Sequence, residues 1–319
     1  MSERSSRILL ADRIAPEGIQ LLEEADGIEV DDRAGITESE LLSVVSGYEA
    51  LIVRSRTHVT AEVLEAGTRL KVVGRAGVGV DNIDVETARQ RGVVVLNAPG
   101  GNVISAAEFA FALMLALVRR IPQADASLRA GRWERSRFRG SELNGKTLGL
   151  IGAGRIGSEV AKRAQAFGMQ VVVHDPCVSP ERAREMGVEL MTLAALLQSA
   201  DVVSIHTPLN DETRGLIGSD QLKLMKPTAY LVNAARGGVV DEVALAAALE
   251  EKNLAGAALD VFEQEPVSAD HPLLKLENVV AVAHLGAATH EAQMHSGIEI
   301  CKAVRDALIV SGSRPAVSV

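Results

Sequence analysis

The chain has 319 residues, of which 47% are hydrophobic and 24% are charged. These values are ordinary for a globular protein, so a disordered or fibrous chain is excluded, and the length suggests about two domains. The net charge is −9, from 33 basic and 42 acidic residues, which argues against nucleic acid as the main partner.

No segment has the pattern of a membrane span or an export signal. The apolar run Phe109–Val118 has ten residues, too few to cross a bilayer. No positively charged start precedes an apolar stretch near the N-terminus, so no signal peptide is expected. The two cysteines, Cys177 and Cys301, are too few for a disulfide framework and fit a reducing compartment. We therefore expect a cytoplasmic protein that does not bind membranes.

Short β-branched runs alternate with longer amphipathic stretches, as in parallel α/β sheets. In the first third, strands are predicted over Arg7–Ala11, Ala50–Arg54, Lys71–Arg75 and Val93–Leu96, and helices over Pro16–Glu24, Glu38–Val45 and Ala61–Ala66. An apolar helix is predicted over Ser105–Val118. A second series of strands is predicted over Thr147–Gly152, Gln170–His174, Asp201–His206, Tyr230–Asn233, Gly256–Asp260 and Val279–His284, before a final helix over Glu291–Val310.

Two such series predict two doubly wound parallel-sheet α/β domains with a cleft between them. Residues 1–97 and 288–319 are expected to form a flavodoxin-like substrate domain, because the last helix is expected to return to the first sheet. Residues 98–287 are expected to form a Rossmann domain that binds a dinucleotide.

A glycine-rich turn is predicted between a strand and a helix. The residues Gly152-Ala153-Gly154-Arg155-Ile156-Gly157 follow an apolar strand and precede the helical stretch Ser158–Phe167. In such turns the glycines allow a tight bend, close approach of a pyrophosphate and packing of helix on strand. Asp175 ends the next strand, 18 residues after Gly157, where it would bind both ribose hydroxyls and repel a 2′-phosphate. The pattern predicts an NAD site; the alternative is a structural turn with a surface aspartate.

Three ionisable residues follow three different predicted strands. Arg236, Glu265 and His284 should therefore meet at the carboxyl edge of the second sheet, where ligands of open α/β sheets bind. An imidazole can exchange a proton with a carbinol oxygen, and a carboxylate can fix its tautomer. A guanidinium can bind a substrate carboxylate with two hydrogen bonds. The three residue types together favour hydride-transfer chemistry on a hydroxy acid, although most histidines are ordinary surface or core residues.

Motifs of metal and nucleophile chemistry are absent from the sequence. His290 and His295 are five residues apart, so they do not share a helix face, and no cysteine cluster is present. No P-loop or G-x-S-x-G pattern occurs. No metal site is expected.

Four longer segments are similar to a known family. Val72–Asn82, Asn233–Gly238, Asp260–Pro266 and His284–Thr289 resemble the D-isomer-specific 2-hydroxyacid dehydrogenases, and the likeness runs along essentially the whole chain. The resemblance implies that Arg236 binds the substrate's carboxylate and keto oxygen, that His284 is the acid/base and that Glu265 orients it. Cofactor contacts are expected at Gly152, Gly154, Arg155, Ile156, Gly157, Asp175, Thr207, Ala234, Asp260 and Gly286, with Asp260 near the nicotinamide amide.

Two departures from the family pattern concern binding residues. Val78 stands where some relatives have a hydroxyl residue near the cofactor. Gly100 and Gly101 replace a more usual Asn or Ser start of a substrate loop, which leaves Asn102 as its expected substrate contact.

The resemblance also implies a reaction. It is strongest with members that oxidise 3-phosphoglycerate with NAD, the first step of phosphorylated serine biosynthesis, and the chain corresponds to their catalytic part without C-terminal regulatory domains. One alternative is a glyoxylate or hydroxypyruvate reductase on the same scaffold. A second, from another class, is an NAD-sensing binding protein like the corepressors that share this fold.

Arginines favour a phosphorylated, anionic substrate. Arg54 and Arg75 each end a predicted strand of the first domain and match phosphate-contacting positions of the family, although they could be surface ion-pair residues. Residues 119–139 hold seven arginines against two acidic residues. Trp133 and Phe138 are the expected anchors of an interface, and the resemblance places this stretch at a two-fold interface with Arg135 near the neighbouring subunit's site. We therefore expect a homodimer or higher homo-oligomer; the alternative is a solvated loop.

Overall fold

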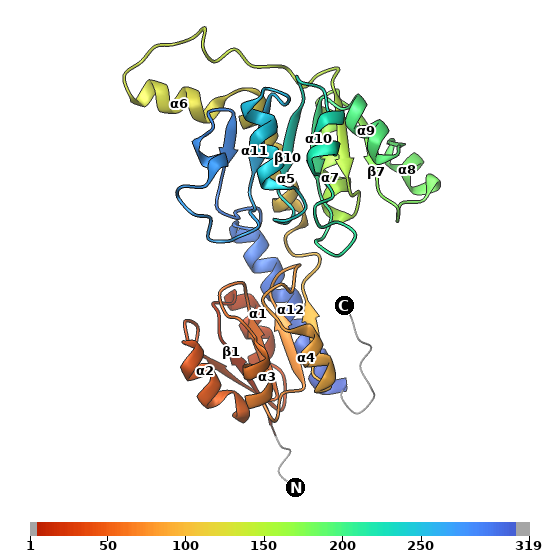
Figure 1. The fold of residues 1–319 in the computed structure, drawn as a ribbon. Coiled ribbons are helices and arrows are strands. Elements are labelled where there is room, and N and C mark those ends of the chain that lie inside the picture. The colour runs from red at the N-terminus through yellow and green to blue at the C-terminus, as the bar shows by residue number, and fades with distance from the viewer. Residues whose placement is uncertain (1–4, 311–319) are drawn as a thin grey trace. The chain divides into compact units, whose positions relative to one another are not determined.

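The computed structural model describes residues 5–310. These residues form two compact units, one comprising the chain up to Val103 and again from Ala287, the other comprising Ile104–Gly286. Each unit is built on one parallel β-sheet covered by helices (Figure 1). The predicted fold class, two parallel-sheet α/β domains, is confirmed.

The first unit has a five-stranded sheet in the order β2-β1-β3-β4-β5. Its strands are β1 (Ser6–Leu10), β2 (Ile28–Asp32), β3 (Ala50–Val53), β4 (Val72–Arg75) and β5 (Val94–Asn97). Its helices are α1 (Pro16–Glu23), α2 (Glu38–Val44), α3 (Ala61–Ala66), α4 (Val85–Gln90) and α12 (His290–Val310), with a 3-10 turn at Val45–Gly47. This is the flavodoxin-like order, in which the chain changes direction across the sheet between β1 and β3.

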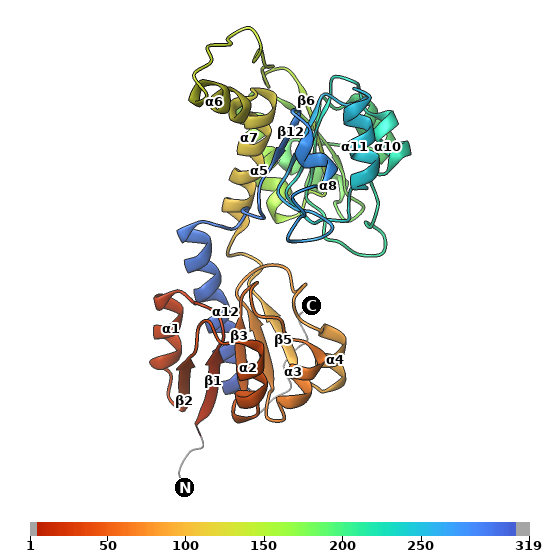
Figure 2. The same ribbon diagram turned by 60° about the vertical axis from the view of Figure 1, so that its left-hand side comes forward.

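Helices cover both faces of this sheet. Alternate residues of β1 point to opposite faces. Ile8 and Leu10 pack in a cluster with Ile300 and Val304 of α12, whereas Leu9 packs in a separate cluster with α2 and α3. Helices α1 and α12 lie on one face and α2, α3 and α4 on the other (Figure 2). Burial on both faces explains why the inner strands β3 and β4 read as short, mostly apolar runs.

The second unit has a seven-stranded sheet in the order β12-β11-β10-β9-β6-β7-β8. The strands are β6 (Thr147–Ile151), β7 (Gln170–His174), β8 (Glu189–Leu190), β9 (Val202–Ile205), β10 (Tyr230–Asn233), β11 (Gly256–Leu259) and β12 (Val279–Ala281). The helices are α5 (Val103–Val118), α6 (Ile121–Arg129), α7 (Arg155–Ala166), α8 (Pro180–Met186), α9 (Leu193–Ser199), α10 (Ser219–Leu224) and α11 (Glu242–Glu250), with a 3-10 helix at Pro272–Lys275. The order is that of a Rossmann sheet with an added strand.

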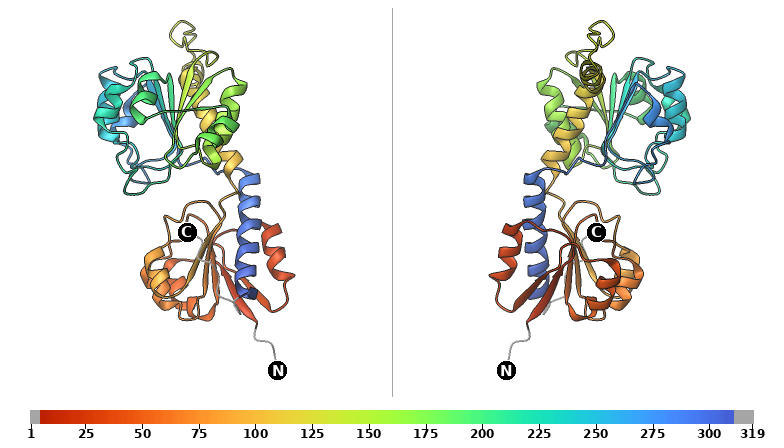
Figure 3. Two further views of the ribbon diagram at one scale, coloured as in Figure 1. Left: turned by 90° about the vertical axis from the view of Figure 1, so that its right-hand side faces the viewer. Right: turned by 90° about the vertical axis from the view of Figure 1, so that its left-hand side faces the viewer.

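Two apolar clusters lie on the two faces of the seven-stranded sheet. Residues of α5 and α7 pack on one face with Leu148 and Leu150 of β6. Residues of α9, α10 and α11 pack on the other face with Val203 and Ile205 of β9. Figure 3 shows helices on both sides of this sheet. The loops at the carboxyl edge of the sheet therefore extend from strands that are buried on both faces.

Several elements differ from the pattern-based predictions. The sequence pattern does not predict strand β2, because three of its five residues, Ile-Glu-Val-Asp-Asp, are acidic; the strand lies at the sheet edge. Helix α6 lies within the arginine-rich stretch 119–139, whose charges mask its weak apolar pattern. Strand β12 ends at Ala281, so His284 lies three residues beyond the strand rather than at its end. No helix among residues 5–310 is long and apolar enough to cross a membrane.

Candidate active site

The turn after β6 is made almost entirely by backbone. Gly152 has φ +90°, and a Cβ there would lie 2.7 Å from the carbonyl oxygen of His206. A Cβ on Gly157 would overlap the carbonyl oxygen of Gly152. A Cβ on Gly154, in contrast, would meet no atom within 4 Å. Gly152 and Gly157 are therefore required by the protein itself, whereas Gly154 leaves open space where a ligand can approach.

The start of α7 offers backbone donors to an anion. Gly154 precedes the helix and provides no side-chain cap, and Arg155 is the exposed first helical residue. The first N–H groups of a helix have no intrahelical partner, and together with the helix dipole they attract a pyrophosphate. Ile156 is half-buried and packs against the cluster of α5 and α7. This end of the helix fits the phosphates of a dinucleotide.

Asp175 follows β7 with its carboxylate held in place. One oxygen accepts a hydrogen bond from the N–H of Ala153 at 2.8 Å, and the other accepts one from the N–H of Cys177 at 2.8 Å. A carboxylate has about four acceptor positions, so two remain for the hydroxyls of a ribose. The glycine turn and this carboxylate together fit the adenosine half of NAD.

His206 and Thr207 follow β9, the strand beside β6. The Nε2 atom of His206 lies 2.8 Å from the hydroxyl of Ser204, and burial lowers the pKa of His206 to about 4. His206 is therefore neutral at ordinary pH, and it adds no charge beside the glycine turn at Gly152. Thr207 is half-buried and its hydroxyl donates to the carbonyl of Pro208 at 2.8 Å.

His284 and Glu265 are in direct contact. The Nδ1 atom of His284 lies 2.7 Å from Oε2 of Glu265. Because a carboxylate only accepts hydrogen bonds, Nδ1 carries the proton and Nε2 is left as the basic atom. The other oxygen of Glu265 accepts from the N–H of Phe262 at 3.0 Å. Both side chains are accessible, with 51% of the His284 side chain and 38% of the Glu265 side chain exposed.

Asp260 holds the backbone that presents His284. It is 1% exposed, and its two oxygens accept hydrogen bonds from the N–H groups of Leu285 at 2.6 Å and Gly286 at 2.9 Å. Its carbonyl accepts from the N–H of His284 at 2.8 Å. Burial raises the pKa of Asp260, against the lowering effect of the two N–H groups. His284 has φ +53°, a region rare for non-glycine residues and frequent at functional sites.

Arg236 lies three residues beyond β10, on a loop that packs against the loop after β11. Asn233 donates to the carbonyl of Arg236 at 2.9 Å and accepts from the N–H of Ala235 at 3.1 Å. A Cβ on Gly237 would overlap the carbonyl of Phe262, so this loop presses against the segment that leads to Glu265. The predicted trio thus lies on adjacent loops of one sheet edge, and half-buried Ala234 lies on the same loop as Arg236.

The predicted substrate residues of the first unit have different environments. Arg54 follows β3 and is half-buried. Arg75 ends β4; its Nε donates to Oδ1 of Asn82 at 2.8 Å, and its terminal Nη1 donates to the carbonyl of Gly79 at 2.6 Å. The Oδ1 atom of Asn102 is buried and has no hydrogen-bond partner among residues 5–310. Val78 is half-buried and its carbonyl accepts from Asn97 at 2.6 Å.

Residues 111–286 match the family model described as D-isomer specific 2-hydroxyacid dehydrogenase, NAD binding domain. The chain belongs to the D-isomer-specific 2-hydroxyacid dehydrogenase family. The matched region lies in the unit that carries the glycine turn, which confirms the prediction of an NAD-binding domain there.

Relatives of known name and structure extend this result. The D-3-phosphoglycerate dehydrogenase of Archaeoglobus fulgidus is 53% identical over 296 residues, 93% of this chain and 56% of that protein. A crystal structure of a protein from Thermus thermophilus has a TM-score of 0.87 at 38% identity and covers 98% of this chain and 99% of its own. A glyoxylate reductase from Paecilomyes thermophila has a TM-score of 0.86 at 30% identity, covering 96% of both chains. The chain spans about half the length of the curated relatives it matches.

Two residues that the sequence did not single out hold a loop of the first unit. Within this member of the 2-hydroxyacid dehydrogenase family, Asp12 and Asn82 are buried polar residues that both bond to the segment Arg54–Thr57. Asn82 lies in a segment noted only for its resemblance, and Asp12 follows β1 without any motif around it. The sequence offers only a weak signal for Asp12, an acidic residue directly after an apolar predicted strand.

Proposed function

We propose that the chain oxidises the 2-hydroxyl of 3-phosphoglycerate to a ketone with NAD, the reaction that opens phosphorylated serine biosynthesis. The observation that carries the proposal is the contact of His284 Nδ1 with Glu265 at 2.7 Å, in the unit that has the nucleotide turn. Relatives named D-3-phosphoglycerate dehydrogenase, at 53% and 50% identity, support the choice of substrate.

In this proposal His284 takes the proton of the substrate hydroxyl on Nε2, since Nδ1 is held by Glu265. The carboxylate of Glu265 stabilises the imidazolium that results. When bound, NAD supplies the acceptor for the hydride that leaves the carbinol carbon. Arg236 binds the substrate carboxylate and polarises the oxygen that becomes the keto group. In the reverse direction the same imidazolium returns its proton to that oxygen.

The phosphate of the substrate needs cationic partners besides Arg236. We assign it to the first unit, with Arg54 and Arg75 at the carboxyl ends of two neighbouring strands and with Asn102, whose Oδ1 is buried without a partner in the described part of the chain. Guanidinium groups pair with phosphate through two parallel hydrogen bonds. Arg135, which is exposed, is assigned to the site of a second subunit.

The oligomer in this proposal is a homodimer formed through residues 119–139. Three large apolar residues in this stretch are exposed: Ile121, Leu128 and Trp133 expose 54%, 57% and 78% of their surface. The same stretch holds seven arginines. Aromatic residues and arginine are enriched at such interfaces. Light scattering at micromolar concentration should give the mass of a dimer, and Trp133→Glu should give a monomer. A monomer mass for the unchanged chain contradicts the assignment. The free Cys177 and Cys301 support a reducing, cytoplasmic location.

The reaction is tested with a substrate panel followed by NADH absorbance in both directions. The panel contains 3-phosphohydroxypyruvate, hydroxypyruvate and glyoxylate for reduction, and 3-phosphoglycerate and glycerate for oxidation, each with NAD(H) and NADP(H). We expect the highest kcat/KM for the phosphorylated pair with NAD(H). Equal efficiency on hydroxypyruvate and its phosphate overturns the phosphorylated substrate and favours a reductase, the activity named for the neighbour from Paecilomyes thermophila. Binding of NADH with no turnover of any substrate points to a sensor.

A further inference from the structure

Arg54 lies where the five-stranded sheet changes its winding direction. The chain runs from β1 outward to β2 and then returns to β3 on the other side of β1. Ligands of open α/β sheets bind beside the carboxyl ends of the two strands that flank such a point. Asp12 follows β1 by two residues, and Arg54 is the first residue after β3. The two strands pair directly, with Leu10 opposite Ile52.

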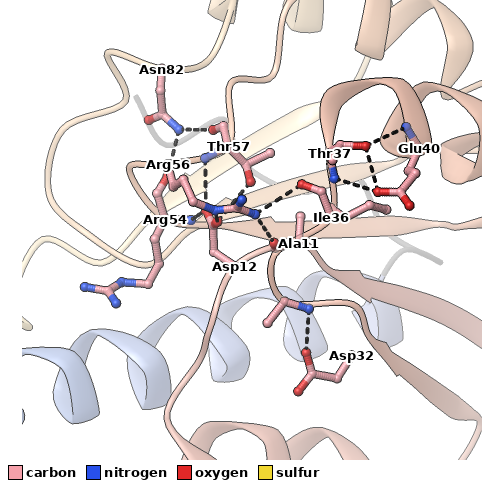
Figure 4. A network of polar contacts seen from close by, with 11 residues as sticks. Ala11, Asp12, Asp32, Ile36, Thr37, Glu40, Arg54, Arg56, Thr57 and Asn82 are labelled. Atoms are coloured by element: carbon pink, nitrogen blue, oxygen red, sulfur yellow. Dashed lines mark hydrogen bonds and ion pairs between the residues drawn. The ribbon is translucent and has the colours of Figure 1, made fainter.

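Asp12 holds the backbone on the amino side of this loop. The residue is 3% exposed. One of its oxygens accepts from the N–H of Arg54 at 2.6 Å and of Thr57 at 3.2 Å. The other accepts from the Thr57 hydroxyl at 2.9 Å and from Nε of Arg56 at 3.0 Å (Figure 4). These bonds occupy the about four acceptor positions of a carboxylate, so Asp12 has no capacity left for a ligand.

Asn82 holds the same loop through its carbonyl groups. Its amide nitrogen donates to the carbonyl of Arg54 at 2.7 Å and to that of Thr57 at 2.6 Å. Its oxygen accepts from Nε of Arg75 at 2.8 Å. The N–H and the carbonyl of Arg54 are therefore both bonded to buried side chains that come from two other loops.

The two candidate phosphate arginines differ in what their side chains do. Arg75 directs Nε to Asn82 and a terminal nitrogen to the carbonyl of Gly79, so much of its guanidinium is used within the protein. The side chain of Arg54 extends away from the Asp12 network (Figure 4), and its guanidinium has no hydrogen bond or ion pair among residues 5–310. Because its backbone is fixed and its guanidinium is not bonded within the described residues, Arg54 is pre-organised to bind an anion.

We propose that Asp12 and Asn82 are positioning residues for phosphate recognition, and that they act by fixing the backbone of Arg54. Arg54 then contacts the phosphate, and Arg75 supports it mainly through Asn82. This inference rests on the proposed function, because it concerns preference for a phosphorylated over an unphosphorylated substrate. It predicts that loss of Asp12 resembles loss of the Arg54 side chain, although Asp12 itself touches no ligand.

The test compares kcat/KM for 3-phosphohydroxypyruvate with that for hydroxypyruvate in the full chain with NADH. Asp12→Asn should lower this ratio by about tenfold, and Arg54→Ala by roughly 10- to 150-fold, the range for hydrogen bonds to a charged group. Both changes should appear in the KM of the phosphorylated substrate, with little effect on kcat or on hydroxypyruvate. An effect of charge alone would raise this ratio in Asp12→Asn, because the substitution removes a negative charge near an anionic substrate.

Matched variants separate positioning from general damage. Asp32→Asn makes the same chemical change on an exposed residue whose carboxylate accepts a hydrogen bond from the N–H of Ala34, two residues along the chain, and it should leave the ratio unchanged. Thr57→Val removes one donor to Asp12, should fold, and should lower the ratio in the same direction by less. In an Arg54→Ala background, Asp12→Asn and Asn82→Ala should have no further effect on the ratio.

The outcomes are distinguishable. If the unchanged chain shows no preference for the phosphorylated substrate, the proposed function is wrong whatever Asp12 does. If the unchanged chain has the preference but Asp12→Asn and Thr57→Val keep it, the positioning role is wrong. It is also wrong if either variant lowers kcat for both substrates equally, or if its effect adds fully to that of Arg54→Ala.

Discussion

In the second unit the turn after β6 is formed by backbone groups, whereas in the first unit the loop after β3 is held by side chains. Both lie at the point where their sheet changes winding direction. The β6 turn needs glycines at three set positions and a following helix. The β3 loop needs Asp12 and Asn82, which lie 42 and 28 residues from Arg54. A backbone-built site therefore leaves a motif in the sequence, and a side-chain-built site does not.

We expect the two units to divide the roles, with proton transfer in the second unit and choice of substrate in the first. His284→Ala should reduce turnover by about 10²- to 10⁴-fold, the usual contribution of a general acid–base group. The loss should be equal for phosphorylated and unphosphorylated substrates, unlike the loss in Arg54→Ala. Stopped-flow rates with both substrates, together with NADH binding, check this. If NADH binding falls together with turnover in His284→Ala, His284 also supports the structure of the cofactor site.

Glu265→Gln gives a control for the same pair. It keeps a hydrogen-bond acceptor near Nδ1 but removes the charge that favours the imidazolium. The base should therefore titrate at lower pH, and the pH profile of kcat/KM should shift to the acidic side. An unchanged pH profile leaves Glu265 as a structural partner only.

The two units should also respond to acid in different pH ranges. His206 has a pKa of about 4 when folded and about 6.5 when unfolded. Between these values the unfolded chain binds the extra proton, so the free energy of unfolding falls as pH falls through that range, by up to roughly 3 kcal/mol.

Asp12 acts at lower pH. Burial raises the pKa of its carboxyl, but the hydrogen bonds from Arg54, Arg56 and Thr57 together hold it below the ordinary value. Its stabilisation is therefore complete above about pH 4 and is lost as pH falls below that value toward the folded pKa. Urea unfolding from about pH 7 to about pH 3, with hydrogen exchange to assign each unit, should show the loss in the second unit first. His206→Gln should remove the first loss and Asp12→Asn the second.

Two glycine variants test whether the β6 turn is built by backbone. Gly157→Ala should destabilise the protein by about 1–3 kcal/mol, because its Cβ overlaps the carbonyl of Gly152. Gly154→Ala should leave the melting temperature nearly unchanged, because its Cβ meets no atom within 4 Å, but should weaken NADH binding. Thermal unfolding and NADH titration separate the two effects. Tight NADH binding by Gly154→Ala contradicts the role of the open space.

Asp175 is the side chain that accepts a hydrogen bond from the β6 turn. Asp175→Ala should weaken NAD binding by about 1–3 kcal/mol, the scale of hydrogen bonds lost at a partly buried polar group. The same variant should narrow the preference for NAD over NADP, since the carboxylate no longer repels a 2′-phosphate. Titration with both cofactors measures this. Equal affinity for NAD and NADP in the unchanged chain rules out the role.

Sequence patterns were sufficient for features that depend on neighbouring residues. Alternating apolar runs predicted two parallel sheets, and the spacing of Gly152, Gly154 and Gly157 predicted a turn that the structure builds with a tight bend and an open approach. The edge strand β2 escaped prediction because three of its five residues are acidic, and only its pairing with β1 explains it. Helix α6 escaped prediction because it lies within the arginine-rich stretch 119–139.

Tertiary structure decided which side chains meet. His284 and Glu265 are 19 residues apart in sequence, and their 2.7 Å contact depends on Asp260 holding a left-handed backbone at His284. Arg54 and Arg75 are the same residue type at the ends of neighbouring strands, so no pattern separates them. In the folded chain Arg75 donates hydrogen bonds to Asn82 and to the carbonyl of Gly79, whereas the Arg54 side chain extends from a fixed backbone. Local conformation follows from adjacent residues, whereas a hydrogen-bond partner is chosen by long-range packing, which a single sequence does not display.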